Sequence, residues 1–170
     1  MICKIPKVTT KIVRKGMVLS YSRSIHSVKD VVEFMGDIYE GADREMIYVL
    51  CQGVKGNVLS IEMAAMGTLD TCMVTAREIF KTALLSNAYG VIIVHNHPSE
   101  DPEPSEEDRK ITQQFVRAGN FLNVQVIDHV IYGRKNRYFS FKEEGLLERY
   151  LEDDRRRIGN EENIDEKDEP

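Results

Sequence analysis

The chain has 170 residues, of which 42% are hydrophobic and 30% charged, so it has the length of one ordinary domain and enough apolar content for a packed core. No apolar run approaches the roughly 20 residues of a membrane helix, and the first residues contain no stretch long enough for a signal peptide. Three scattered cysteines, Cys3, Cys51 and Cys72, argue against a disulfide framework and against a cysteine-based zinc site. We therefore expect a cytoplasmic protein without membrane contact.

The net charge of −5 is unevenly distributed along the chain. Residues 152–170 hold nine acidic and four basic residues, so the rest of the chain is neutral overall. Residues 1–29 contain seven Lys or Arg and no acid. A basic arm can bind nucleic acid, but this one lacks interleaved aromatic residues, which favours a solvated extension. We expect a basic arm over 1–25, one domain over 26–151 and a disordered acidic tail over 152–170.

Hydrophobic periodicity and turn residues predict the elements in chain order. They are a strand near 17–21, a helix over 27–41, strands over 45–52 and 57–66 joined by a turn at 53–56, a helix from a Thr-x-x-Glu capping box at 75 to about 87, a strand over 90–95, a helix from 105 to about 122, strands over 124–132 and 138–141, and a helix from 142 to about 151. Strands and helices alternate in the middle, with hairpins at both ends. This order predicts an α/β domain whose mixed sheet is covered by helices on both faces.

His95 and His97 lie at the end of the predicted central strand, and Pro98 follows directly. In an extended segment, residues i and i+2 point to the same side, so the two imidazoles can converge on one point. Taken alone, such a His-x-His pair at a strand end is more often incidental.

Asp108 follows a proline-rich loop and lies three residues past Ser105, the predicted N-cap of the next helix. On its own this pair indicates only a helix start. The loop can bring the first helical turn back to the strand end, where Asp108 completes a set with His95 and His97. Two His and one Asp with an open position are typical of a catalytic zinc, which makes an activated water available at neutral pH. The Ser105 hydroxyl could also stabilise a developing oxyanion.

Two segments, His-Asn-His-Pro-Ser at 95–99 and Pro-Ser-x-x-Asp at 104–108, resemble the JAMM signature of the Jab/MPN metalloprotease superfamily. Over about residues 26–148 the chain resembles the bacterial RadC branch of that superfamily. Further matches are Arg44-Glu45, Gly67-Thr68-Leu69, Arg77-Glu78-Ile79-Phe80 with Ala83, Asn87-Ala88, Asp128-His129-Val130-Ile131 with Gly133, and Ser140-Phe141 with Gly145.

The resemblance implies an MPN/JAB fold with a cytidine-deaminase-like three-layer arrangement. It implies one zinc ion per chain, held by His95, His97 and Asp108, and hydrolysis of a peptide or isopeptide bond in a protein or peptide substrate. A glutamate outside the ligand set would take a proton from the attacking water and pass it to the leaving amine. Glu45 matches the family position of this base, Glu62 in the next strand is the rival, and Ser105 would donate a hydrogen bond to the oxyanion.

The chain departs from the RadC pattern in two ways. Glu100 stands where a glycine commonly follows the His-Asn-His-Pro-Ser segment, which implies a different loop and an added negative charge near the metal. The arm before Ser27 is also too short for the helix-hairpin-helix region of longer RadC proteins. We therefore expect a short form that contains only the catalytic domain.

Several alternatives stay open at the level of the sequence. A DNA-associated role would rest on the basic arm, while residues 30–151 carry 12 basic and 19 acidic residues, a poor match for DNA. A scaffold that keeps the metal for folding is the other alternative. His129, in a predicted strand, could orient a metal ligand, but the sequence favours an ordinary hydrogen-bonded core or edge histidine. Nothing in the sequence decides between a monomer and a dimer.

Overall fold

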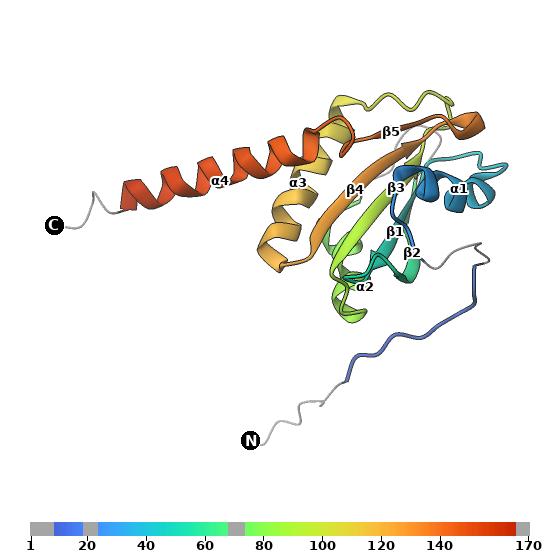
Figure 1. Ribbon diagram of the computed structural model, residues 1–170, viewed down its shortest axis with the longest axis horizontal. Coiled ribbons are helices and arrows are strands. Elements are labelled where there is room, and N and C mark those ends of the chain that lie inside the picture. The colour runs from blue at the N-terminus through green and yellow to red at the C-terminus, as the bar shows by residue number, and fades with distance from the viewer. Residues whose placement is uncertain (1–8, 19–23, 68–73, 166–170) are drawn as a thin grey trace, which may run out of the picture.

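The computed structural model describes residues 9–18, 24–67 and 74–165, which form a five-stranded sheet with helices on both faces (Figure 1). The elements are α1 (Val28–Tyr39), β1 (Met46–Gln52), β2 (Val58–Met66), α2 (Ala76–Leu85), β3 (Gly90–Asn96), α3 (Glu106–Leu122), β4 (Gln125–Tyr132), the 3-10 helix η1 (Arg134–Asn136), β5 (Tyr138–Ser140) and α4 (Leu146–Asp165). The predicted α/β class with a mixed sheet is confirmed.

The strand order β2-β1-β3-β4-β5 places β3 in the centre of the sheet. β3 runs parallel to β4 and antiparallel to β1, and the two outer pairs are antiparallel. All seven residues of β3 are buried, as expected for an apolar strand that is covered on both faces. The helix α3 follows β3 and returns the chain to β4, so its first turn lies at the carboxyl end of β3 (Figure 1).

Alternate residues of β3 contribute to two separate cores. Val91 and Ile93 pack with residues of α2 and α3 on one face, whereas Ile92 and Val94 pack with α1 on the other. The buried Tyr39 hydroxyl at the end of α1 donates a 2.8 Å hydrogen bond to the carbonyl of Val94. His95 continues the alternation and points to the α2–α3 side, where a buried polar group needs a partner.

Two predicted elements differ from the observed ones. The strand expected near 17–21 lies partly outside the described residues, and Met17 and Val18 are not in a strand. The last helix begins at Leu146, after a turn in which Gly145 has φ of 68°, and its predicted end near Leu151 is wrong because α4 continues to Asp165. The first part of the segment predicted as an acidic tail is therefore helical.

A buried carboxylate explains why α4 continues past its predicted end. Asp154 is 3% exposed, and its Oδ1 lies 3.4 Å from Nε of Arg117 on α3 and 3.5 Å from Nη2 of Arg157. An acidic residue counted as solvated in the sequence thus attaches α4 to α3. Among the described helices, none has the length and apolar content needed to cross a membrane.

Candidate metal centre

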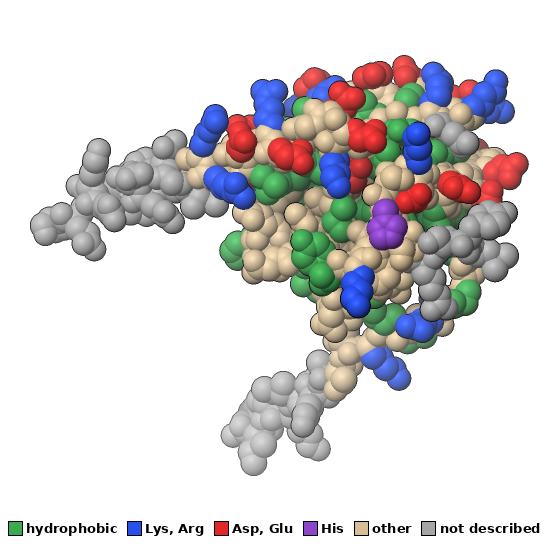
Figure 2. Space-filling model, viewed as in Figure 1, with side chains coloured by type: hydrophobic (Ala, Val, Ile, Leu, Met, Phe, Trp, Pro, Cys, Tyr) green, Lys and Arg blue, Asp and Glu red, His purple; other side chains and the backbone are tan. Residues whose placement is uncertain are grey.

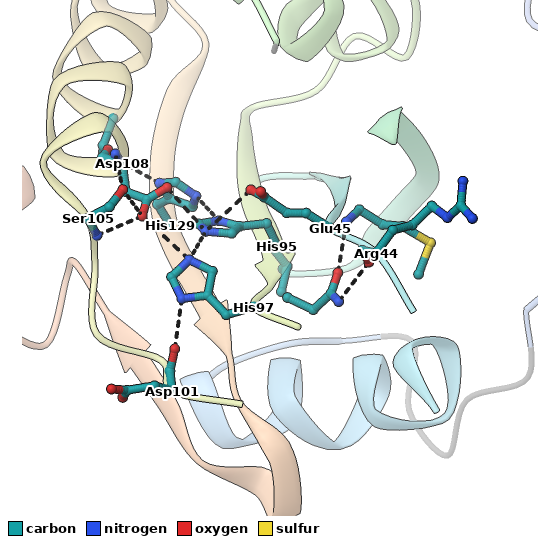
Figure 3. A network of polar contacts seen from close by, with 12 residues as sticks. Arg44, Glu45, His95, His97, Asp101, Ser105, Asp108 and His129 are labelled. Carbon is teal, nitrogen blue, oxygen red and sulfur yellow. Dashed lines mark hydrogen bonds and ion pairs between the residues drawn. The ribbon is translucent and has the colours of Figure 1, made fainter. Parts of the chain in front are cut away.

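Three polar side chains converge where β3 ends and α3 begins (Figure 3). The Nε2 atoms of His95 and His97 are 3.1 Å apart. Asp108 faces both rings, with Oδ1 3.3 Å from His95 Nε2 and Oδ2 3.5 Å from His97 Nε2. One ligand atom of each residue lies within 4.8 Å of the others. Two imidazole nitrogens and a carboxylate form a donor set that suits zinc, so the predicted residues fit a metal ion.

The opposite ring nitrogen of each histidine has its own hydrogen-bond partner. His97 Nδ1 lies 2.7 Å from the carbonyl oxygen of Asp101 in the proline-rich loop. His95 Nδ1 lies 2.9 Å from Nε2 of His129 on β4. A carbonyl can only accept, so His97 Nδ1 carries the hydrogen and its Nε2 is the atom available to a metal. The sequence left the role of His129 open, and the structure places it directly behind a ligand (Figure 3).

The capping box predicted at the start of α3 is confirmed, and it also orients Asp108. Asp108 Oδ2 accepts hydrogen bonds from the backbone N–H of Ser105 at 2.8 Å and from its hydroxyl at 2.6 Å. Burial raises the pKa of Asp108, but the close approach of His95 and His97 outweighs it and holds this pKa well below its usual range. The Ser105 hydroxyl donates to Asp108 here, and its role toward an oxyanion stays a prediction.

Glu45 lies on the other side of the ligand set, with Oε1 4.0 Å from His95 Nε2 (Figure 3). Burial raises the pKa of Glu45 above its ordinary value, nearby His95 opposes this effect, and the charge of Asp108 adds to it. A raised pKa makes a carboxylate a better proton acceptor near neutral pH.

The side chain of Asn96 holds the backbone on both sides of Glu45. Its Oδ1 accepts from Met46 N–H at 2.8 Å, and its Nδ2 donates to the Arg44 carbonyl at 3.0 Å. Asn96 is 4% exposed, and both contacts are at least partly buried. The residue between the two histidines thereby fixes the backbone of the candidate base.

Glu62, the rival for the role of base, is engaged elsewhere. It lies on β2, with Oε1 3.3 Å from Nζ of Lys81 and a hydrogen bond from the hydroxyl of Thr82, both on α2. Of the two glutamates, the structure places Glu45 beside the ligands.

Glu100 adopts the backbone conformation that favours glycine, with φ of 67°. Its carboxylate forms an ion pair with Arg134, and its carbonyl accepts a 2.6 Å hydrogen bond from Arg137. The added negative charge expected near the metal is therefore paired with an arginine of the neighbouring turn.

Acidic and basic side chains are interspersed over the domain on the face seen in Figure 2. The acid-free stretch 1–29 includes the arm over 1–25, and the structure describes residues 9–18 and 24–29 of this stretch. Binding of nucleic acid by this arm stays a prediction.

Comparison with known proteins gives one family. A family model of the RadC-like JAB domain matches residues 25–146. A protein of Thermotoga maritima named "UPF0758 protein" is 49% identical over 105 residues, which cover 62% of this chain and 47% of that protein. A protein of the same name from Chlorobium chlorochromatii is 41% identical over 133 residues, 76% of this chain and 60% of that protein. The chain thus spans about half of one relative and three fifths of the other, and their names state no activity.

Proposed function

Since the chain belongs to the RadC-like JAB domain family, which has the fold of JAMM-type metal-dependent hydrolases, we propose that it is a zinc-dependent hydrolase of peptide or isopeptide bonds. One observation carries the proposal: two histidine nitrogens and a carboxylate meet at one point, and a second, partly buried carboxylate lies beside them. A metal-stabilised scaffold needs the first three groups, but it has no use for the fourth.

The roles follow from the positions of the side chains. His95, His97 and Asp108 would hold the ion. When bound, zinc supplies Lewis acidity, which polarises a carbonyl and lowers the pKa of water to about 7. Glu45, whose pKa is raised by burial, accepts a proton from the attacking water at its carboxylate and transfers it to the leaving amine.

Ser105 has two tasks in this proposal. Its hydroxyl caps α3 and orients Asp108, as the 2.6 Å hydrogen bond indicates. During attack on a carbonyl, the same hydroxyl would turn its hydrogen toward the oxygen on which negative charge develops. The proposed substrate is a protein or peptide, whose peptide or isopeptide bond supplies the carbonyl and the leaving amine.

Metal content tests the first part of the proposal. We expect elemental analysis of the purified full chain to give about one zinc per chain and Asp108→Ala to lose it, since two imidazoles alone are a weak site. Wild-type protein that binds no metal, even after zinc is added back, would overturn the catalytic proposal. It would also overturn the alternative of a scaffold that is stabilised by a metal.

A matched pair of isosteric variants tests the base. Glu45→Gln and Glu62→Gln each replace one carboxylate by an amide of the same shape. We expect Glu45→Gln to retain zinc and to lose about 10²- to 10⁴-fold in hydrolysis of peptide and isopeptide-linked substrates, whereas Glu62→Gln keeps both. Loss of hydrolysis in Glu62→Gln alone would reverse the assignment. Zinc binding with no hydrolysis of any substrate by the wild type would favour the scaffold.

A further inference from the structure

A chain of three hydrogen bonds, two of them buried, connects two of the candidate ligands through residues that hold no metal. His95 Nδ1 lies 2.9 Å from His129 Nε2, and His129 Nδ1 lies 2.6 Å from the Thr112 hydroxyl. That hydroxyl also donates to the backbone carbonyl of Asp108, one turn earlier on α3. His95, His129 and Thr112 are each 2% exposed or less, so water cannot replace the two contacts of His129.

The last bond of this chain sets the direction of all three. A backbone carbonyl only accepts, so Thr112 uses its single hydroxyl hydrogen toward Asp108. Toward His129 the same oxygen must then accept, which places a hydrogen on His129 Nδ1.

If the His129 ring is neutral, its Nε2 carries no hydrogen, and the surroundings of the ring favour the neutral form. Phe141 stacks on it, with ring centroids 5.1 Å apart and planes 11° from parallel, and Phe115 lies 6.5 Å away. Among the described residues, its hydrogen-bond partners are an imidazole and a hydroxyl, not a carboxylate. A charged ring buried with such partners would be strongly unfavourable. His129 Nε2 is therefore an acceptor, and His95 Nδ1 must donate to it.

We propose that His129 and Thr112 are positioning residues that fix His95 with its hydrogen on Nδ1, so that Nε2 presents a lone pair to the metal. The inference rests on the proposed metal site and adds two residues to it. With the opposite direction of donation, the hydrogen of His95 would lie on Nε2, between the ring and the ion. The same chain ends on the backbone of Asp108, so the ligand from β3 and the ligand from α3 are held by one set of bonds.

Two substitutions at position 112 separate this role from simple packing. Thr112→Val keeps the shape and removes the hydroxyl, whereas Thr112→Ser keeps the hydroxyl and removes a methyl group. We expect Thr112→Val to bind zinc about 10- to 100-fold more weakly in competition with a chromogenic chelator, and Thr112→Ser to stay close to wild type. Equal affinity of Thr112→Val and wild type, or equal weakening in both variants, would overturn the proposal.

The ring hydrogens can also be observed directly. In the full chain labelled with ¹⁵N-histidine, long-range nitrogen–proton correlation spectra distinguish the two neutral tautomers. We expect His129 and His95 each to carry hydrogen on Nδ1 in the zinc-loaded protein, and His129 to lose this preference in metal-free Thr112→Val. Zinc-loaded protein with His129 protonated at Nε2 overturns this inference alone. Wild-type protein that binds no zinc overturns the proposed function, and this inference with it.

Discussion

The two candidate histidine ligands meet at one point but are held in opposite ways. His97 is 17% exposed, and its Nδ1 donates to the carbonyl of Asp101 in a surface loop. His95 is 1% exposed, and its Nδ1 is held by His129, which a phenylalanine ring covers. Both arrangements leave Nε2 for the metal, one through a single contact at the surface and one through a chain of contacts in the core.

This difference follows from the positions of the two residues relative to β3. His95 lies within the strand, where side chains alternate between two cores, so its ring is built into the core under α3. His97 lies past the end of the strand, and the loop that follows can adjust around it. We therefore expect the fold to depend on His95 and to tolerate changes at His97, although metal binding needs both.

The largest expected effect is on the stability of the metal-free protein. His95→Ala opens a cavity and leaves His129 Nε2 without a donor, which together cost about 3 kcal/mol. His97→Ala frees the carbonyl of Asp101 to bind water and costs less than about 1 kcal/mol. Urea unfolding of both variants in the presence of a chelator measures the two losses. Equal losses would show that the two ligands are supported alike.

A second test shows whether zinc affinity depends on hydrogen bonding to the ligands or only on buried polar residues being intact. Asp128 precedes His129 on β4 and is 5% exposed, but it accepts hydrogen bonds from the Ser140 hydroxyl and from Lys142 N–H, not from the ligands. Asp128→Asn keeps an acceptor oxygen there. We expect this variant to bind zinc as tightly as the wild type, in contrast to Thr112→Val. Weaker zinc binding by Asp128→Asn would mean that any change among the buried residues around His95 disturbs the metal centre.

The same variant has a distinct pH signature. Burial raises the pKa of Asp128 to about 6, from 3.8 in the unfolded chain. The folded state therefore binds the proton more tightly, and the stability due to this group is full below pH 3.8 and is lost as pH rises to about 6. We expect the wild type to lose about 3 kcal/mol relative to Asp128→Asn over this window. If the free energies of unfolding of the wild type and of Asp128→Asn changed in parallel over this pH window, the raised pKa of Asp128 would be contradicted.

The sequence contained enough information for most of the order of elements and for the three side chains that the structure brings together as candidate ligands. The uniformly apolar segment before His95 predicted a central strand, and the Ser105–Asp108 pair predicted the helix start that the structure confirms. These features are local, because a strand period or a capping box is written in a few adjacent residues. They also determine which side chains can converge at the end of β3.

The supports of the site are not local, and sequence reasoning could not assign them. Thr112 lies inside α3 with no motif around it, and it meets His129 only because β4 pairs in parallel with β3 at one register. A His inside an apolar strand signals that some buried partner must exist, but not which one. The continuation of α4 depends in the same way on Asp154 meeting Arg117, 37 residues earlier in the chain.

The smallest expected effect is on the stability of the exposed loop that follows His97, at Glu100. Its φ of 67° is unfavourable for any residue with a Cβ atom, and its ion pair with Arg134 is exposed. Glu100→Ala loses the pair and keeps the strain, whereas Glu100→Gly loses the pair and relieves the strain, so the glycine variant should be more stable than the alanine variant by about 1 kcal/mol. Thermal unfolding would show this as a melting temperature higher by about 2 to 4 °C.

Zinc affinity should be unchanged in both variants, because His97 is held by the carbonyl of Asp101 and not by the side chain of Glu100. A loss of affinity in both would show that the Glu100–Arg134 pair holds the loop around His97, and the exposed half would then be as constrained as the buried one.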